Sequence, residues 1–182
     1  MGGDPMQFVF ETTYDQKALT AMARCVRKTT RKKRSRRSHV LGWIVAVLGA
    51  LLPFISGEDG LVIDFGAIVT WTAVAVIVIA LVFEDRLNAY FARRRMIKGS
   101  EKAKAIFDTE VEDAFVSETA VGKTEFPYGC VLAVAETQRY FAFMLSADHA
   151  QIYDKSTLTG GTADAFREFI SERTGRPVTP VF

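Results

Sequence analysis

The stretch that decides the architecture is "RKTTRKKRSRRSHVLGWIVAVLGALLPFISGEDG", Arg27 to Gly60. Six of the seven residues from Arg31 to Arg37 are basic, and Val40–Ile55 carries no charge. Two acids then follow, at Glu58 and Asp59. Such a stretch is either a nucleic-acid-binding arm before a buried helix or the inner end of a membrane span. The next segment separates these alternatives.

Leu61–Phe83 is a second apolar run, 23 residues long, whose single charge is Asp64. About 20 apolar helical residues cross a hydrocarbon core of about 30 Å, so this run qualifies alone. The first run is shorter, but arginines at its start can extend to the interface. A soluble helix would show a polar stripe, and the chain has too little other sequence to bury two apolar helices. The pattern predicts a transmembrane hairpin, residues 40–83, with spans 40–56 and 61–83.

The positive-inside rule sets the expected orientation. Nine Lys/Arg lie between Arg24 and Arg37 and five between Arg86 and Lys98, whereas the connecting turn has none. We therefore expect a two-span protein of the cell membrane with both termini in the cytoplasm. A basic collar at each span should contact anionic lipid headgroups, each base contributing about 1 kcal/mol: Arg31, Lys32, Lys33, Arg34, Arg36, Arg37, Arg93, Arg94 and Arg95. Nucleic acid is not expected, because no aromatic residues interleave with these bases and the run adjoins a span.

The rest of the chain predicts an α+β membrane protein. Residues 1–39 read as a strand, Gln7–Thr12, and an amphipathic helix from Asp15; residues 84–105 read as a second basic helical stalk. Residues 106–175 show period-two strands and then a helix capped by Thr162 and stopped by Gly175. This predicts a small antiparallel, pleckstrin-homology-like (PH-like) cytoplasmic domain closed by a C-terminal helix, followed by a loose tail, 176–182.

No motif indicates catalysis, a cofactor or a metal site. Cys25 and Cys130 are the only cysteines, and His39 and His149 are far apart in the sequence. The segment "AVGKT" resembles the end of a phosphate-binding loop, but Ser117 stands where that loop needs glycine. We therefore expect no enzyme, and no catalytic, cofactor-binding or metal-binding residue can be named.

Two features of the spans have both a functional and a structural interpretation. Asp64 could mark an ion path, but its place near the outer interface favours a residue that complements the helix dipole. Gly42, Ala46 and Gly49 fall on one helical face, which allows close helix packing. They could serve a homo-oligomer or a larger assembly, or only join the two spans of one hairpin, and the last is favoured.

The order of segments resembles the bacterial YcxB-like family, whose C-terminal domain is also strand-rich and PH-like. The local similarity lies in "FVSETAVGKTEFPYGCVLAVAETQRYFAFMLSADHAQIYDKSTL", residues 115–158. Phe126 or Tyr128 takes the family's aromatic position, Val134–Glu136 and Phe141 match its strand pair, and Ile152–Lys155 match its last element. The resemblance implies no catalytic residues.

These observations predict a membrane-anchored, PH-like interaction module that binds a protein or peptide partner without catalysis. Residues 106–182 carry a net charge of −6, which disfavours anionic lipid as a ligand of that domain and favours basic proteins or other membrane proteins as partners. An open sheet edge would offer a site for strand addition. The alternative is a small subunit of a membrane transport or signalling assembly that acts through its spans.

Overall fold

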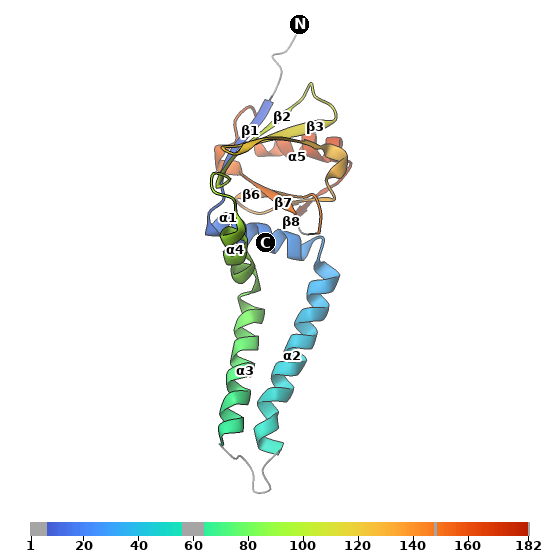
Figure 1. Ribbon diagram of the computed structural model, residues 1–182. Helices are drawn as coiled ribbons and strands as arrows, with labels where there is room; N and C mark the ends of the chain where they lie inside the picture. Colours follow the sequence, from blue (N-terminus) through green and yellow to red (C-terminus); the bar gives the residue numbers. More distant parts are fainter. Residues whose placement is uncertain (1–6, 56–63, 148, 182) are drawn as a thin grey trace. The chain divides into compact units, whose positions relative to one another are not determined.

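The computed structural model describes residues 7–55, 64–147 and 149–181. Over these residues it is an α+β structure with five α-helices and two four-stranded sheets (Figure 1). The chain divides into two compact units, one formed by residues 1–31 and 88–182 and the other by residues 32–87. The predicted hairpin tip, residues 56–60, lies outside the described residues.

Residues 32–87 contain two long helices, α2 (Lys32–Ile55) and α3 (Phe65–Val82), and the start of α4 (Glu84–Arg95). A Cβ on Gly42 would lie 2.8 Å from Leu81, and one on Gly49 would lie 2.8 Å from Val74. Gly42, the earlier of the two glycines in α2, faces the later residue of α3, Leu81, and Gly49 faces the earlier one, Val74. The two helices therefore pack antiparallel. The same two helices are also joined by a hydrogen bond, which the Trp71 indole N–H donates to the Ala50 carbonyl at 3.4 Å.

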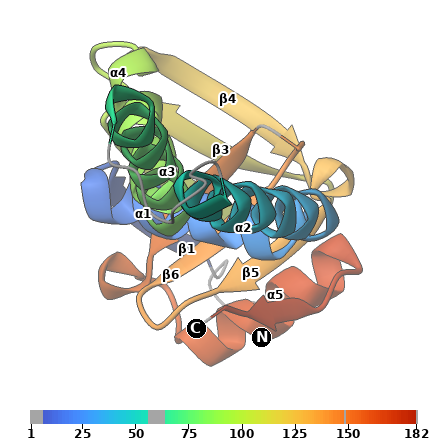
Figure 2. The ribbon, with the colours of Figure 1, turned by 90° about the horizontal axis from the view of Figure 1, so that it is seen from below.

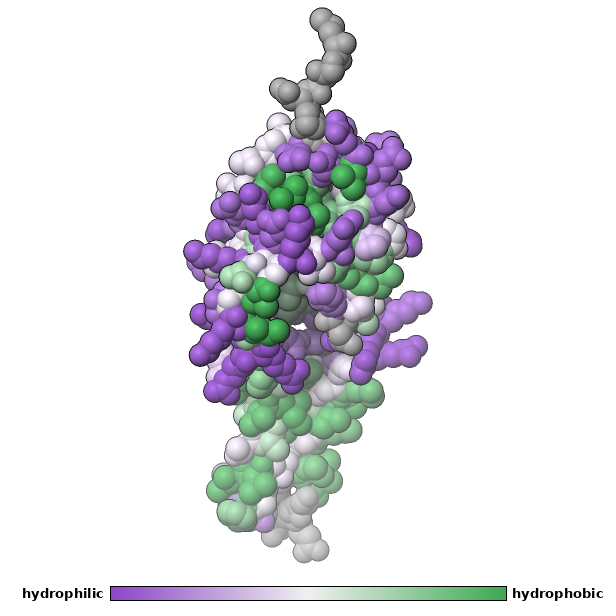
Figure 3. Space-filling view, turned by 45° about the horizontal axis from the view of Figure 1, so that its top comes forward, coloured by the Kyte–Doolittle hydropathy of each residue, from purple (hydrophilic) through white to green (hydrophobic). Residues whose placement is uncertain are grey.

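Helices α2 and α3 have the length and the apolar composition needed to span a membrane. Only 11% of the most apolar window of α2 and 6% of that of α3 is buried. Figure 3 shows the apolar side chains gathered on the surface of these helices. A core helix of a soluble protein would be mostly buried, so these helices are not core helices of this chain.

The other unit contains two sheets. Sheet A has the order β1–β2–β3–β4, with every pair antiparallel. Its strands are β1 (Gln7–Thr13), β2 (Lys102–Asp108), β3 (Ala114–Thr119) and β4 (Gly122–Pro127). Strand β1 pairs with β2 over its whole length, from Gln7 opposite Asp108 to Thr13 opposite Lys102. The N-terminal strand therefore belongs to the same sheet as residues about a hundred positions later.

Sheet B has the order β7–β6–β5–β8. Its strands are β5 (Ala133–Glu136), β6 (Tyr140–Met144), β7 (Ala150–Asp154) and β8 (Val178–Pro180), with short 3₁₀ turns at Tyr128–Cys130 and Lys155–Thr157. Strands β5, β6 and β7 are antiparallel, whereas β8 runs parallel to β5. Helix α5 (Ala163–Thr174) begins at Thr162, whose hydroxyl accepts from the Ala165 N–H, and ends at Gly175 with φ of 61°. Both predicted caps are confirmed.

An aromatic core fills the space between the two sheets and α5. Phe166 of α5 packs on Phe10 of β1, with ring centroids 4.7 Å apart, and on Phe107 of β2 at 4.9 Å. Phe141 and Phe143 of β6 are fully buried in the same cluster. Because aromatic side chains bury large areas and pack edge to face, this cluster joins both sheets and α5 into one core.

A second core lies on the opposite face of sheet B, beneath α1 (Gln16–Lys28). Ala18 and Cys25 of α1 pack against Ala142, Met144 and Ile152 of sheet B. The side chain of Asp15 caps the helix by accepting from the Ala18 N–H at 2.7 Å. The view from below shows α1 crossing the strands of sheet B (Figure 2). Sheet B is therefore covered on both faces, and α1 is part of the folded unit.

The structure differs from the predicted division of the chain in three places. Residues 102–105 were predicted as part of a helical stalk, but they begin β2, because the alternation of Lys102 and Lys104 with Ala103 and Ala105 buries the alanines. The predicted loose tail forms β8, and the buried Val181 follows it. The segment 1–39, predicted as one piece, splits: α1 joins the sheets, and the basic run begins α2.

Candidate functional site: ion pairs at one end of sheet B

Charged side chains gather where β5 and β7 end and β6 begins. Glu136, the last residue of β5, accepts from Arg167 of α5: Nε to Oε2 at 2.7 Å and Nη2 to Oε1 at 2.9 Å. Lys155, directly after β7, donates to the same carboxylate from its ammonium group. The Glu136 side chain is only 14% exposed. Two cations therefore hold one nearly buried carboxylate.

This arrangement keeps Glu136 ionised. The hydrogen bonds from Arg167 lower the pKa of Glu136, burial works in the opposite direction, and Lys155 adds a further lowering. The same contacts raise the pKa of Arg167, which also donates to Asp164 at 2.5 Å. The four groups form a network that joins β5, β7 and α5.

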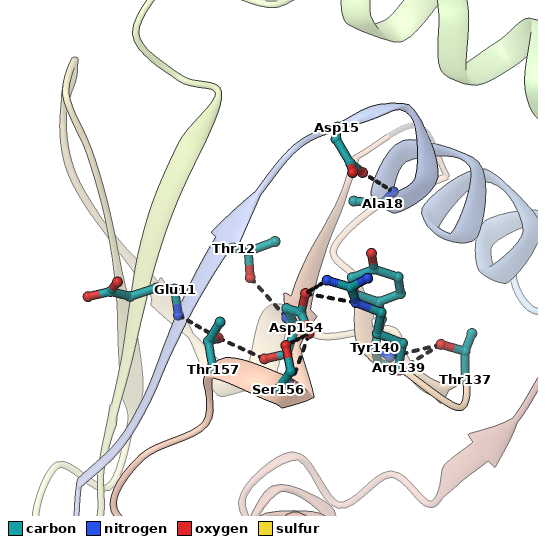
Figure 4. Close-up of polar contacts among 10 residues, drawn as sticks. All are labelled: Glu11, Thr12, Asp15, Ala18, Thr137, Arg139, Tyr140, Asp154, Ser156 and Thr157. Carbon is teal, nitrogen blue, oxygen red and sulfur yellow. Dashed lines mark hydrogen bonds and ion pairs between the residues drawn. The ribbon is translucent and has the colours of Figure 1, made fainter.

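Asp154, the last residue of β7, organises the neighbouring contacts (Figure 4). Arg139 donates to Asp154 Oδ2 from Nε at 3.0 Å and from Nη2 at 2.7 Å. Ser156 donates to Oδ1 from its backbone N–H and its hydroxyl, at 3.0 and 2.7 Å. The Asp154 N–H donates to Thr12 Oγ1 at 3.0 Å, which ties β7 to β1.

Asp154 is also held as a carboxylate. Its burial works to raise its pKa, but the hydrogen bonds from Arg139 and Ser156 outweigh burial and hold the pKa below its ordinary value. In the described part of the chain, each ionised group of these two networks has a fixed partner, and no set of three His, Cys, Asp or Glu side chains is placed to hold a metal ion. Together the two networks tie β1, β5, β7 and α5 to one another through ion pairs and hydrogen bonds.

A hollow of about 300 Å³ lies beside Arg139, between α1 and the Thr137–Tyr140 turn. Arg24 of α1 lines it together with Arg139 and Tyr140. The Arg139 side chain is 58% exposed, and two of its five N–H groups bind Asp154. Guanidinium groups bind carboxylates and carbonyl oxygens of peptides, so this hollow can receive an acidic peptide segment.

A second hollow, of about 380 Å³, lies on sheet A beside the 3₁₀ turn after β7. It is lined by acids, lysines and hydroxyls, including Glu11, Lys104, Glu118 and Thr157. Thr157 Oγ1 accepts from the Glu11 N–H at 3.0 Å and joins the turn to β1. Its mixed charges favour no single class of ligand.

None of the site residues singled out from the sequence belongs to these two networks. The first turns of α2 contain Lys32, Lys33, Arg34, Arg36 and Arg37, and the last turn of α4 contains Arg93, Arg94 and Arg95. The Arg31 guanidinium donates to the Ala147 carbonyl at 2.9 Å. Contact of this basic collar with lipid stays a prediction.

The small residues of α2 face α3. Gly42 and Gly49 contact Leu81 and Val74, and Ala46 between them is buried. Asp64 caps α3, its carboxylate accepting from the Ala67 N–H at 2.7 Å. Within the described residues, Gly42 and Gly49 therefore pack α2 against α3, and Asp64 caps α3.

Sequence reasoning did not identify the ion-pair networks. Glu136 and Lys155 are 19 residues apart and Arg167 is 31 residues from Glu136, so no local spacing relates them. A weaker signal was present in the sequence: β5 ends in Glu136 and β7 ends in Asp154. In an antiparallel sheet, alternate strands end at the same edge, which brings such residues near one another.

A family model described as YcxB-like protein matches residues 112–170. The matched segment runs from just before β3 to Ile170 of α5, and it contains both ion-pair networks except Thr12. No curated protein and no solved structure matches the chain. The match covers about a third of the chain, and over residues 112–170 it confirms the predicted resemblance to the YcxB-like family.

Proposed function

We propose that this chain is an integral membrane protein whose hairpin, α2 and α3, anchors a PH-like unit in the cytoplasm, and that this unit binds a protein partner without catalysis. The observation that carries the proposal is the exposure of apolar side chains along both long helices. Leu41 is 62% exposed, Leu48 60% and Val76 61%. In water these side chains would cost free energy in proportion to their exposed area, whereas lipid removes that cost.

The orientation rests on charge. One group of bases precedes Val40 at the start of α2, and another follows the end of α3. Because α2 and α3 are antiparallel, these two helix ends lie on the same side. The acids Glu58 and Asp59 lie in the sequence that connects the two helices. The positive-inside rule places the basic ends in the cytoplasm. The folded unit formed by residues 1–31 and 88–182 would then be cytoplasmic.

The PH-like character rests on topology. Two sheets enclose an aromatic core, and a C-terminal helix, α5, contributes Phe166 and Ile170 to it. The described structure adds β1, α1 and β8 to the strands expected from residues 106–175. Our proposal therefore extends the PH-like description to the whole folded unit rather than to its C-terminal part alone.

The partner preference changes once the folded unit is known. Residues 106–182 alone carry net −6, but residues 1–31 and 88–182 together hold 17 Lys/Arg and 16 Asp/Glu. Net charge thus gives no reason to favour basic partners. The hollow beside Arg24 and Arg139 favours an acidic peptide segment instead.

The alternative, an assembly subunit that acts through its spans, relied on the small residues of the first span. Gly42 and Gly49 lie against α3 of the same chain, so this face is already used within the hairpin. The observation favours the anchored interaction module.

The test is site-specific photocrosslinking in native membranes. A photoreactive residue at Gln138, an exposed position of the hollow, should capture a partner, whereas one at the exposed Glu168 of α5 should not. Arg24→Glu should reduce capture at position 138 without reducing the amount of folded protein in the membrane. Equal capture at both positions, or capture that Arg24→Glu leaves unchanged, would exclude this surface.

A further inference from the structure

Strand β4 is an open edge of sheet A. One side of Gly122–Pro127 pairs with β3 along all six residues. No hydrogen bond joins the other side to any residue that the structure describes. Only Phe126 of this strand is half-buried, on the ring of Phe115 at 5.5 Å, and the rest is exposed.

The other sheet edges are shorter or partly occupied. Strand β8 has three residues. Strand β1 is bridged to Thr159 by two hydrogen bonds of 3.0 Å through Val9, and β7 reaches β1 through Thr12. Among the described strands, β4 therefore offers the longest free row of backbone donors and acceptors, which is a template for another strand.

The hairpin geometry fixes which backbone groups point outward. Thr119 and Gly122 flank a two-residue loop and form a hydrogen-bonded pair, and hydrogen-bonded pairs alternate along an antiparallel ladder. Thr124 and Phe126 then bond β3, while Lys123 and Glu125 direct their N–H and C=O groups away from it. Pro127, which has no N–H to donate, falls at an outward position at the end of the strand.

The sequence of β4 is complementary to itself in one antiparallel register. With Thr124 opposite Thr124 of a second copy, Lys123 lies opposite Glu125 and Glu125 opposite Lys123. The lysine and the glutamate are the residues whose backbone groups point outward, so the same two pairs would exchange four hydrogen bonds. Opposite charges directly across a ladder stabilise it, and like charges destabilise it.

The charges also exclude the neighbouring registers. Centring the pair on Lys123 would place two lysines opposite each other, and centring it on Glu125 would place two glutamates opposite each other. Edge lysines normally prevent strand pairing. Here Lys123 lies opposite a glutamate in one register only. The edge therefore permits pairing with a second copy in that register and disfavours pairing in the neighbouring ones.

We propose that β4 is a self-association edge through which two copies of this chain join their A sheets into one antiparallel sheet about a twofold axis at Thr124. This goes beyond the proposed function, because it concerns contact between two copies and does not use the hollow beside Arg139. The partner is a second copy of this chain, and the interface is isologous.

The first test is disulfide trapping of the full chain in native membranes. In a non-hydrogen-bonded antiparallel pair the Cα atoms lie about 4.5 Å apart, within the range of a disulfide. Thr124→Cys, with Cys130→Ser to remove the partly exposed native thiol, should give a crosslinked dimer on mild oxidation. Thr179→Cys on β8, an exposed threonine of another edge strand, is the matched control and should give little.

The second test uses charge reversal in trans. In the Thr124→Cys background, Glu125→Lys should reduce the crosslinked dimer about tenfold, since two opposite-charge pairs become like-charge pairs. Glu125 is the better position, because Lys123 also forms an ion pair of 3.3 Å with Glu118 of its own chain. Co-expression of a Glu125→Lys chain with a Lys123→Glu chain should restore crosslinking, because the mixed pair is again complementary. Restoration also shows that both variants fold.

Three results would overturn the proposal. The first is equal crosslinking of the Thr124→Cys and Thr179→Cys chains. The second is a mixed pair that crosslinks no better than either single variant. The third is capture of a different protein at position 124 in place of a second copy, which would assign the edge to another partner.

Discussion

Phe10→Ala should destabilise the whole unit formed by residues 1–31 and 88–182. Phe10 lies in β1, near the N-terminus, yet its ring is fully buried in the core. It packs on Phe166 of α5 at 4.7 Å, on Tyr153 of β7 at 5.7 Å and on Phe107 of β2 at 5.8 Å. A single side chain thus contacts both sheets and the C-terminal helix.

The expected cost follows from truncating a fully buried ring. A Phe→Ala change in a core costs about 3–5 kcal/mol, including the cavity that remains. Domains are typically stable by about 5–15 kcal/mol, so the variant would lose a large share of its stability. For a unit of this size the midpoint of thermal unfolding should fall by about 10–20 °C.

Pulse proteolysis in urea measures the effect on the full chain in detergent micelles. A C-terminal tag reports cleavage within the matched YcxB-like segment, far from the substitution in the sequence. Phe91→Ala is the matched control, since Phe91 is 52% exposed and its loss should cost less than about 0.5 kcal/mol. If Phe10→Ala leaves the urea midpoint of that segment unchanged, β1 is not part of its core and the described fold is refuted.

Three further predictions concern the spans, the ion pairs and a helix cap. Gly42→Leu together with Gly49→Leu should separate α2 from α3, because even a Cβ at either position would lie 2.8 Å from a facing side chain. His39 and Glu84 are in contact, so crosslinking between cysteines placed at these two positions should fall in this variant while membrane insertion persists. Unchanged crosslinking would contradict the packing. Glu136→Gln should lower stability at neutral pH. The pKa of Glu136 is lowered from 4.5, so its contribution to stability is complete above that pH and is lost as the pH falls from there through the lowered pKa of the folded state. The urea midpoints of wild type and variant should therefore converge in acid, and a constant gap would contradict the ion pairs. Thr162→Ala should cost about 1 kcal/mol in the same assay, through loss of the α5 cap, and Thr162→Ser should not.

Elements with strong local signals were predicted well. The alternation of Phe8 and Phe10 gave β1, and Thr162 and Gly175 gave both ends of α5. The two apolar helices followed from their length and the absence of charge. In these cases the residues that determine each element lie within that element or directly beside it in the sequence.

Elements that depend on distant partners were missed or misplaced. The pattern of Lys102–Ala105 suits a helix by propensity, because lysine and alanine both favour helices, and only pairing with β1 and β3 makes it a strand. Val178–Pro180 is too short to be recognised as a strand without β5 beside it. The ion pairs of Glu136 likewise join three elements, so no spacing along the chain could indicate them.

The central claim is that the hairpin crosses the membrane and leaves the folded unit on the cytoplasmic side. One cysteine is added at position 58 or at position 176, in a chain with Cys130→Ser whose remaining native thiol, Cys25, is buried, and is labelled with a membrane-impermeant maleimide. The account predicts that Glu58→Cys is labelled in intact cells, that Arg176→Cys is labelled only after permeabilisation, and that alkaline carbonate does not extract the chain. Labelling of Arg176→Cys in intact cells, or release of the chain by carbonate, would contradict it.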